Sequence, residues 1–286
     1  MKDDGNGTLL PARSMKRILT LLCVASALLL LNAGATSAEP LPGGQPEPGP
    51  APAPAPAGKM AAIVIDDFGN NLAGTEQMMA LPQPITTAIM PFLPTTHRDA
   101  EWSHKAGHEV IVHLPMEPKQ GRKEWLGPGA ITTALSDDEI RKRVGAAIDD
   151  VPYAVGINNH MGSRATGDKR VMTIVLEVCK ERGLFFLDSR TNYRSVVPEV
   201  SSAVGLHTLA NQMFLDDIVT HRHVSGQMEK LRKLMEEQDR GIAIGHVGNP
   251  GKITSAVLKQ TMPELGKQFR FVRLSEMLAA DRAKGS

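Results

Sequence analysis

The sequence has few cysteines, few aromatic residues and almost no net charge, and each shortage excludes a class of protein. Its 286 residues include two cysteines, Cys23 in an N-terminal apolar segment and Cys179. A mature chain without that segment has no partner for Cys179, which excludes a fold held by intramolecular disulfides. The surrounding pattern places Cys179 on the apolar side of a helix, as a small buried hydrophobe.

The charge balance and the aromatic content narrow the function further. The formal net charge of +1 excludes a basic nucleic-acid-binding surface as the dominant feature. Aromatic residues make up 4% of the sequence, which argues against a broad aromatic platform for stacking sugars. No Gly-x-Gly-x-x-Gly follows the first apolar strand and there is no P-loop, so nucleotide binding has no support. Apolar residues make up 42%, which is enough for a packed core.

The N-terminal segment has the composition of a secretory signal. A basic start at 15–17, MKR, precedes the apolar run 18–31, and small residues follow up to a predicted cleavage site after Ala38. The alternative is a retained membrane anchor, but the apolar run is shorter than the about 20 residues that span a bilayer. We therefore expect residues 1–38 to be an extension and signal peptide. The protein is then secreted or periplasmic, with no stable membrane span after cleavage.

A linker separates this segment from the folded domain. Residues 39–58 are rich in proline and alanine, a composition that favours extended polyproline II and cannot form a core. We expect the folded domain to cover residues 59–286. Its length is about that of one α/β barrel.

Apolar runs alternate with helical patterns along this domain. The expected strands are 61–65, 85–90, 109–113, 154–157, 184–187, 207–214 and 241–245, with a further candidate at 270–274. The expected helices are 74–80, 97–106, 136–149, 169–182, 195–203, 224–238, 255–265 and 275–282. Ser136 with Glu139 forms a capping box, and Asp168 is a second N-cap. The alternation predicts a parallel sheet, either a barrel or an open doubly wound sheet.

Residues that bind metals or move protons stand at the ends of successive predicted strands. They are Asp66, Asp67, His113, His160, Asp188 and His246. A single histidine after a strand is usually structural, but three histidines and three aspartates at corresponding positions favour one site, because strand ends converge on one face of a barrel. Two imidazoles and one carboxylate with an open position are typical ligands of a catalytic zinc. Asp66 and Asp67 need not share a role, since neighbouring side chains on a strand point to opposite sides.

Five segments in order resemble the divergent polysaccharide deacetylase family, a branch of the carbohydrate esterases with a NodB-homology barrel. They are IDD at 65–67, HLPMEP at 113–118, NNHMGS at 158–163, FLDSRT at 186–191 and IGHV at 244–247. The resemblance implies a distorted (β/α)7 barrel of polysaccharide deacetylase type and a divalent metal, Zn²⁺ in the first instance. It also implies hydrolysis of the acetamide of an N-acetylated sugar, in a polysaccharide or peptidoglycan-type substrate.

The resemblance also implies roles for individual residues. Asp66 corresponds to the base, Asp67 to a metal ligand, and His246 to the general acid. The His-x-x-x-His ligand pair of typical members is replaced here, because His113 is followed by Glu117. We therefore expect Asp67, His113 and His160 to bind the metal, with Glu117 as a rival ligand or supporting residue.

Other polar residues near these segments have open roles. Asp188 is expected to orient a histidine or a ligand. Arg164 either meets an anionic group, pairs with Asp66 or forms another salt bridge. Asn158 and Asn159 are expected to tie down backbone rather than to bind sugar. The pair Asp216-Asp217 is either a turn or part of the active-site rim.

The sequence leaves competing functions. The first is a metal-dependent polysaccharide deacetylase of the cell envelope, in which the metal and Asp66 activate water. The alternative is a non-catalytic envelope barrel that binds glycan or a partner protein, because NNHMGS replaces the Arg-Pro-Pro-Tyr type segment of typical members. A third is a metal hydrolase for another bond, such as a phosphoester.

Overall fold

Strand β1 (Met60–Phe68) lies at the centre of the fold because nearly all of its residues are apolar and buried. The structure is a computed structural model and describes residues 58–285. The predicted signal peptide and nearly all of the predicted linker lie outside the described residues. Within residues 58–285, no helix has the length and hydropathy needed to cross a membrane.

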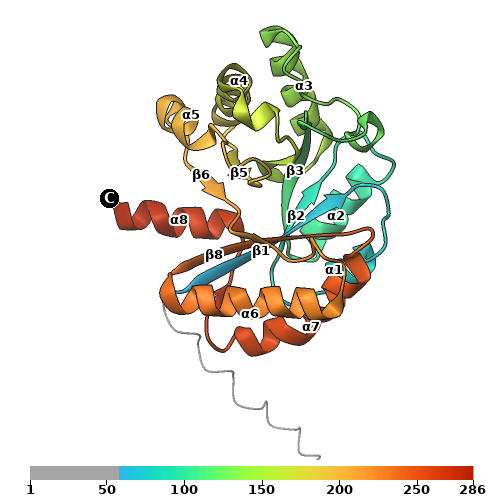
Figure 1. The fold of residues 1–286 in the computed structure, drawn as a ribbon, viewed down its shortest axis with the longest axis vertical. Coiled ribbons are helices and arrows are strands. Elements are labelled where there is room, and N and C mark those ends of the chain that lie inside the picture. Colours follow the sequence, from blue (N-terminus) through green and yellow to red (C-terminus); the bar gives the residue numbers. More distant parts are fainter. Residues whose placement is uncertain (1–57, 286) are drawn as a thin grey trace, which may run out of the picture. The chain divides into compact units, whose positions relative to one another are not determined.

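The strands form one parallel sheet, which is strongly curled (Figure 1). Its strand order is β6-β5-β4-β3-β2-β1-β8-β7, with β9 paired to β1. The bounds are β2 (Thr86–Ile89), β3 (Glu109–Met116), β4 (Ala154–Met161), β5 (Phe185–Asp188), β6 (Thr208–Ala210), β7 (Met213–Phe214), β8 (Arg240–His246) and β9 (Arg270–Phe271). Parallel pairing throughout confirms the expected alternation of strands and helices, and the strong curl of the sheet confirms the (β/α) barrel over the open doubly wound alternative.

The two edges of the sheet meet through two residues of the chain. Strands β6 and β7 end the strand order on opposite sides, yet only Asn211 and Gln212 separate them in sequence. Three Cα steps span at most about 11 Å, so the edges must lie close together. The expected strand 207–214 is therefore two short strands that pair with β5 and with β8, and this seam is the distortion of the barrel.

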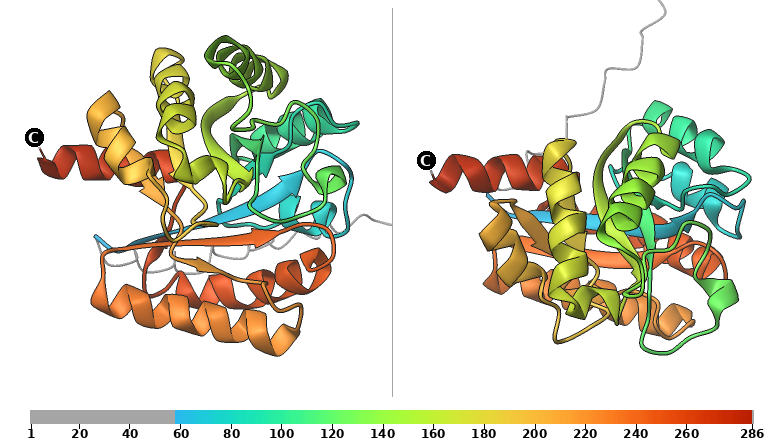
Figure 2. Two further views of the ribbon diagram at one scale, coloured as in Figure 1. Left: turned by 45° about the horizontal axis from the view of Figure 1, so that its top comes forward. Right: turned by 90° about the horizontal axis from the view of Figure 1, so that it is seen from above.

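Helices cover the outside of the curled sheet (Figure 2). They are α1 (Thr75–Met79), α2 (Thr96–Lys105), α3 (Asp137–Asp150), α4 (Lys169–Glu181), α5 (Val197–Val204), α6 (His221–Glu237) and α7 (Gly251–Leu265). The last helix, α8 (Leu274–Gly285), packs differently. Short 3-10 turns lie at η1 (Lys123–Trp125) and η2 (Ala165–Gly167). Both predicted caps are confirmed: Ser136 accepts a hydrogen bond from Glu139 N, and Asp168 accepts one from Val171 N.

Strand alternation divides the apolar residues into two layers. In β1, Ala61, Ile63 and Ile65 belong to the layer between sheet and helices, whereas Met60, Ala62 and Val64 belong to the barrel interior. Leu274, Met277 and Leu278 of α8 join the interior layer. Helix α8 therefore packs against the amino-terminal end of the barrel. It does not cover the opposite end, the mouth of the barrel, where the carboxyl ends of the strands lie.

The buried carboxylate of Glu109 fastens α8 to the barrel. It accepts hydrogen bonds from Leu274 N at 2.9 Å, Ser275 N at 3.1 Å and Thr86 Oγ1 at 3.0 Å. We expect Glu109→Ala to lower the free energy of unfolding by about 2–4 kcal/mol, because several buried donors lose their acceptor. Urea denaturation measures this loss. The control Glu101→Ala removes an exposed carboxylate paired with Lys105 and should leave the midpoint unchanged. A Glu109→Ala midpoint equal to that of the wild type would contradict the assignment.

Candidate metal centre

Strand alternation brings three polar side chains to the mouth of the barrel. Each lies two positions after an apolar residue of the interior layer, so it points inward in the same way. The pairs are Val64 and Asp66 in β1, Ile111 and His113 in β3, and Ile244 and His246 in β8. Because β1 and β8 are neighbours in register, Asp66 stands opposite His246.

Asp67 reaches the same mouth because the backbone departs from strand geometry. Its φ is +71°, in the left-handed region that is uncommon for residues other than glycine. The pairing of β1 with β2 also shifts between Ile65 and Phe68, as in a β-bulge. The left-handed turn places Asp67 beside inward-facing residues, although the alternation of β1 alone would point it outward. Strain of this kind is common at functional sites.

Asp67, His113 and His160 form a compact cluster. Asp67 Oδ1 lies 3.3 Å from His113 Nε2 and 3.1 Å from His160 Nδ1, and the two nitrogens are 3.1 Å apart. His113 is buried, whereas 28% of the Asp67 side chain and 18% of the His160 side chain are exposed. The cluster is therefore buried on the side of His113 and open to solvent on the side of Asp67 and His160.

Hydrogen bonds on the far side of each ring fix which nitrogen faces the cluster. Asn158 Nδ2 donates to Asp66 Oδ1 at 2.9 Å, so Asn158 Oδ1 accepts from His113 Nδ1 at 2.7 Å. His160 Nε2 donates to the carbonyl of Trp125 at 2.9 Å. In their neutral forms, both imidazoles therefore present a lone pair to Asp67.

This donor set fits a divalent cation. Three acceptor atoms about 3.1–3.3 Å apart repel one another unless a positive charge lies between them. Ligand atoms at about 2.0–2.1 Å from a zinc ion stand about 3.0–3.4 Å from one another, which matches these separations. Two imidazoles and one carboxylate are also the ligand types found in catalytic zinc sites.

The electrostatics of the site agree with this assignment. Burial would lower the pKa of His113, yet the charges of Asp66 and Asp67 outweigh burial and raise that pKa above its ordinary value. Burial would raise the pKa of Asp67, but His113 and His160, which donate to Asp67 and carry positive charge when protonated, hold that pKa well below its ordinary value. Burial dominates at Asp66 and raises its pKa. The two carboxylates thus favour positive charge at the cluster.

Asp216 positions His246 on the other side of Asp66. Asp216 Oδ1 accepts from His246 Nδ1 at 2.7 Å, while Oδ2 accepts from His246 N and Thr254 Oγ1, both at 2.8 Å. A Cβ on Gly245 would lie 3.3 Å from Asp216 Oδ2 and 3.0 Å from Thr254 Cγ2, so glycine makes room for this contact. Burial would lower the pKa of His246, but Asp216 and then Asp66 raise it to about 9.

We expect Asp216→Asn to lower the pKa of His246 by about 1–2 units, because the amide keeps the shape of the carboxylate and removes its charge. The protonated imidazole, which persists to about pH 9 in the wild type, should then be lost at lower pH. NMR titration of the metal-free protein measures this change. The control Asp217→Asn removes the adjacent carboxylate, which pairs with His223. A His246 pKa that stays near 9 in Asp216→Asn would contradict the role of Asp216.

Glu117 and Arg164 lie outside the cluster and pair with each other. Glu117 Oε2 accepts from Thr133 N at 2.7 Å and Thr133 Oγ1 at 2.8 Å, and Glu117 Oε1 lies 3.4 Å from Arg164 Nε. Arg164 therefore pairs with Glu117, and the expected option of a pair with Asp66 is wrong. Glu117 supports the loop after β3. His160, and not the alternative ligand Glu117, lies in the cluster with Asp67 and His113.

The two asparagines after Ile157 have different roles. Asn159 ties down backbone as expected, donating to Met161 O at 2.7 Å and accepting from Ser189 N at 3.0 Å. For Asn158 the same expectation is wrong, because its amide bridges the side chains of His113 and Asp66. Asn158 faces inward because it stands two residues before His160 on β4.

Asp188 does not orient a histidine in the described residues. Its Oδ1 accepts from Arg190 N at 2.8 Å, and its buried Oδ2 has no hydrogen-bond partner there. On β5, Phe185 and Leu187 belong to the interior layer, so Asp188 falls on the opposite side of the strand. Asp216 has the orienting role instead. The repeat of an Asp pair at 216–217 was the available sequence signal.

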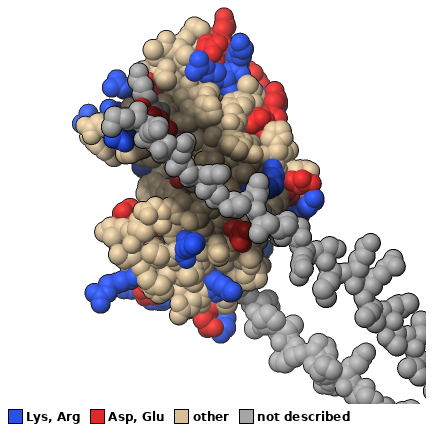
Figure 3. Space-filling view, turned by 90° about the vertical axis from the view of Figure 1, so that its right-hand side faces the viewer, with Lys and Arg blue, Asp and Glu red and all other residues tan. Residues whose placement is uncertain are grey.

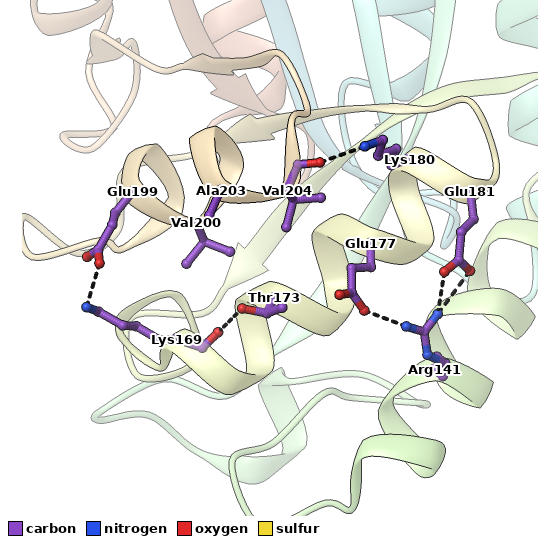
Figure 4. A pocket seen from close by; sticks show the side chains of 10 residues that line it. All are labelled: Arg141, Lys169, Thr173, Glu177, Lys180, Glu181, Glu199, Val200, Ala203 and Val204. Atoms are coloured by element: carbon purple, nitrogen blue, oxygen red, sulfur yellow. Dashed lines mark hydrogen bonds and ion pairs between the residues drawn. The ribbon is translucent and has the colours of Figure 1, made fainter.

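Ion pairs line a second surface feature of the domain. A groove of about 650 Å³ lies among α3, α4 and α5 (Figure 4). There Lys169 pairs with Glu199, and Arg141 pairs with Glu177 and Glu181. On the face in Figure 3, basic and acidic side chains are interspersed. Neither surface offers a set of side chains comparable with the metal centre.

Comparisons with known proteins find relatives of this chain in other bacteria. The chain is 36% identical over 222 residues to the uncharacterized protein YibQ of Escherichia coli K12, covering 78% of this chain and 68% of the relative. It is 33% identical over 216 residues to an uncharacterized protein of Haemophilus influenzae, covering 76% and 75% of the two chains.

A solved structure shares the fold. The crystal structure of an uncharacterized protein from Agrobacterium tumefaciens C58 matches with a TM-score of 0.72 at 19% identity, over 77% of this chain and 89% of that chain. The sequence profile described as divergent polysaccharide deacetylase matches residues 63–278, which include the cluster, Asp66 and His246. This chain therefore belongs to the divergent polysaccharide deacetylase family.

Proposed function

We propose that the protein is a metal-dependent deacetylase that hydrolyses the acetamide of N-acetylated sugars in a polysaccharide or peptidoglycan-type substrate. The observation that carries the proposal is the meeting of Asp67, His113 and His160 at one barrel mouth, with Asp66 and His246 beside them. Membership of the family supports the acetamide as the bond that is broken.

Asp67, His113 and His160 would hold the metal, for which zinc is our first choice. A divalent cation bound there supplies Lewis acidity, which makes water more acidic and polarises a carbonyl group. Asn158 and the carbonyl of Trp125 keep the two imidazoles in the tautomers that such binding requires.

Asp66 accepts the proton of the attacking water. Its Oδ1 is held by Asn158, and its Oδ2 lies 3.7 Å from His113 Nε2, adjacent to the cluster without belonging to it. A carboxylate at that position is within reach of a water at the mouth and is oriented before the substrate arrives.

His246 donates a proton to the leaving amine as the C–N bond breaks, so that acetate and the free amine are released. Its Nδ1 is held by Asp216, which leaves Nε2 for the substrate. The ring also stacks against Phe214, with centroids 6.0 Å apart and an interplanar angle of 19°. The hydrogen bond to Asp216 and the stacking on Phe214 thus fix the orientation of the imidazole, and Asp216 raises its pKa, which favours the protonated form.

We also propose that the reaction takes place outside the cytoplasm, in the cell envelope. The pattern of a basic start, an apolar run at 18–31 and small residues before 38 supports this location.

Acetate release from N-acetylglucosamine oligosaccharides by the purified protein tests the proposal. We expect release that a chelator abolishes and added zinc restores. Release that persists after complete metal removal would contradict the metal dependence. If the zinc-loaded protein binds glycans but releases no acetate from any acetylated substrate, the non-catalytic alternative replaces this proposal.

A further inference from the structure

A polar pocket lies among the loops that follow β3, β4 and β5. It measures about 350 Å³, within the range of small-ligand sites, and its lining includes Lys119, Arg164, Asn192 and Arg194. Lys119 follows the end of β3, and Arg164 lies four residues after the cluster residue His160.

Hydrogen bonds between three loops hold this pocket on the same strands as the cluster. Lys119 N donates to Ser163 Oγ at 2.9 Å and joins the loops after β3 and β4. Thr191 Oγ1 donates to Met161 O at 2.6 Å and joins the loop after β5 to the end of β4. The pocket is therefore part of the same rigid rim, so a ligand in it would be positioned relative to the metal centre.

A buried amide side chain joins two loops of this pocket. Asn192 is 4% exposed, and its Oδ1 accepts from Arg194 N at 3.0 Å and Lys119 Nζ at 3.4 Å. A Cβ on Gly167 would lie 2.9 Å from Asn192 Nδ2, so glycine leaves room for the amide at the wall of the pocket. Asn192 therefore holds the ammonium group of Lys119 and the backbone of Arg194 at the pocket.

The charges of the side chains that line the pocket favour an anion. Within residues 58–285, neither Lys119 nor Arg194 has a carboxylate partner, and the Nε of Arg164 makes its 3.4 Å contact with Glu117. The lining carboxylate, Asp168, already uses its Oδ1 to cap α4. The lining thus carries three cationic side chains and one carboxylate, and guanidinium groups bind carboxylates and phosphates well.

An exposed aromatic ring beside the pocket suits a sugar. Tyr193 is 84% exposed, and its ring centroid lies 5.9 Å from Lys119 Nζ and 5.4 Å from Arg194 Cζ. The two cations hold the ring next to the pocket while its outer surface stays free. A sugar ring can therefore cover Tyr193 while its anionic group enters the pocket.

We infer that the pocket of Lys119, Arg164, Asn192 and Arg194 binds an anionic sugar, through a carboxylate or a phosphate, in the same glycan chain as the acetylated sugar. For the reaction this inference rests on the proposed function, but for binding it does not. The substrate class is then an acidic N-acetylated polysaccharide rather than a neutral one.

Calorimetric titration of the full-length protein tests binding separately from activity. The probes are neutral N-acetylglucosamine tetramer, a tetrasaccharide alternating glucuronate with N-acetylglucosamine, and a 6-phosphorylated N-acetylglucosamine tetramer. We expect at least one anionic probe to bind about tenfold more tightly than the neutral one, with an advantage that falls as salt rises. The tighter of the two identifies the group as carboxylate or phosphate.

Variants assign this preference to the pocket. Arg194→Gln and Lys119→Gln should each reduce the affinity ratio of anionic to neutral probe about five- to tenfold. The control Lys267→Gln removes an exposed cation of similar charge, paired with Glu264, and should leave the ratio unchanged. Circular dichroism verifies that each variant is folded.

The outcomes separate the two proposals. Equal binding of all three probes, or an unchanged ratio in both pocket variants, would overturn the inference even if the protein deacetylates neutral oligosaccharides. Anionic preference that depends on Arg194 and Lys119 would support the inference even if no acetate is released, in which case only the proposed function fails. For an active protein, kcat/KM should show the same preference as binding.

Discussion

Asp66→Asn should lower kcat for acetate release by about 10²–10⁴-fold, the usual contribution of a positioned general base, while zinc stays bound. The asparagine can still accept the hydrogen bond that Asn158 Nδ2 donates to Asp66 Oδ1. The bridge from Asn158 to His113 is therefore retained, and the loss reports the missing proton acceptor rather than a displaced ligand.

Steady-state kinetics and elemental analysis on the same samples measure this effect. The matched comparison is Asp67→Asn, which removes the ligand but keeps a residue type that tolerates the left-handed backbone of position 67. It should lose both zinc and activity. Asp217→Asn, on the exposed pair with His223, serves as the neutral control. If Asp66→Asn kept the wild-type kcat, Asp66 would not be the base. If the variant no longer bound zinc, Asp66 would be a metal ligand instead.

The architecture could be predicted from the sequence because buried strands and amphipathic helices have distinct periods. The boundaries were harder where polar residues belong to strands. β3 continues through Met116 and β4 through Met161, since His113 pairs with Asn158 and Pro115 with His160 inside the ladder. A motif rich in polar residues resembles a loop in sequence, although here the interior side of the strand is polar because it lines the mouth.

The site was predictable to the extent that strand alternation governs it. Asp66, His113 and His246 continue the inward-facing positions of their strands, so their convergence follows from the barrel. Asp67 does not, because its position depends on a bulge and a positive φ that no local composition signals. Sequence resemblance was needed to single it out as a ligand.

The partner of His246 could not be predicted because its strand is interrupted. Asp216 follows β7, which has two residues and is separated from β6 by the seam at Asn211. The sequence of such a short strand does not predict which of its side chains face inward. The position of Asp216 therefore fitted a turn as well as the rim of the active site. Asp188 stands at the end of a clear strand, β5, and for that reason was expected to have the role that the structure gives to Asp216.

His113→Gln should abolish zinc binding and reduce acetate release to the background rate. His113 is the buried member of the cluster and is 2% exposed, so solvent cannot replace its imidazole. The variant also breaks the link from Asn158 to the metal centre. Substituting a residue that only supports a ligand typically costs 10–100-fold in metal affinity, so the loss of a ligand should exceed that.

Thermal unfolding with and without zinc gives a readout that does not depend on activity. Zinc at about 100 times its Kd stabilises the folded state by about 2.7 kcal/mol, which for a domain of this size corresponds to a rise in Tm of about 5–10 °C. The wild type should show this rise and His113→Gln should not. Because a buried substitution can impair folding by itself, His160→Gln provides a second test at a partly exposed ligand.

His97→Gln is the matched control, since His97 is an exposed histidine that pairs with Asp150. It should keep the full zinc-dependent shift, which separates the cluster from general binding of zinc to surface imidazoles. A shift that survives in both His113→Gln and His160→Gln but disappears in His97→Gln would place the metal elsewhere. The chemistry assigned to the barrel mouth would then be wrong. Asp66 and His246 can act on the same substrate at a metal only if the cation lies between the strands that carry these two residues.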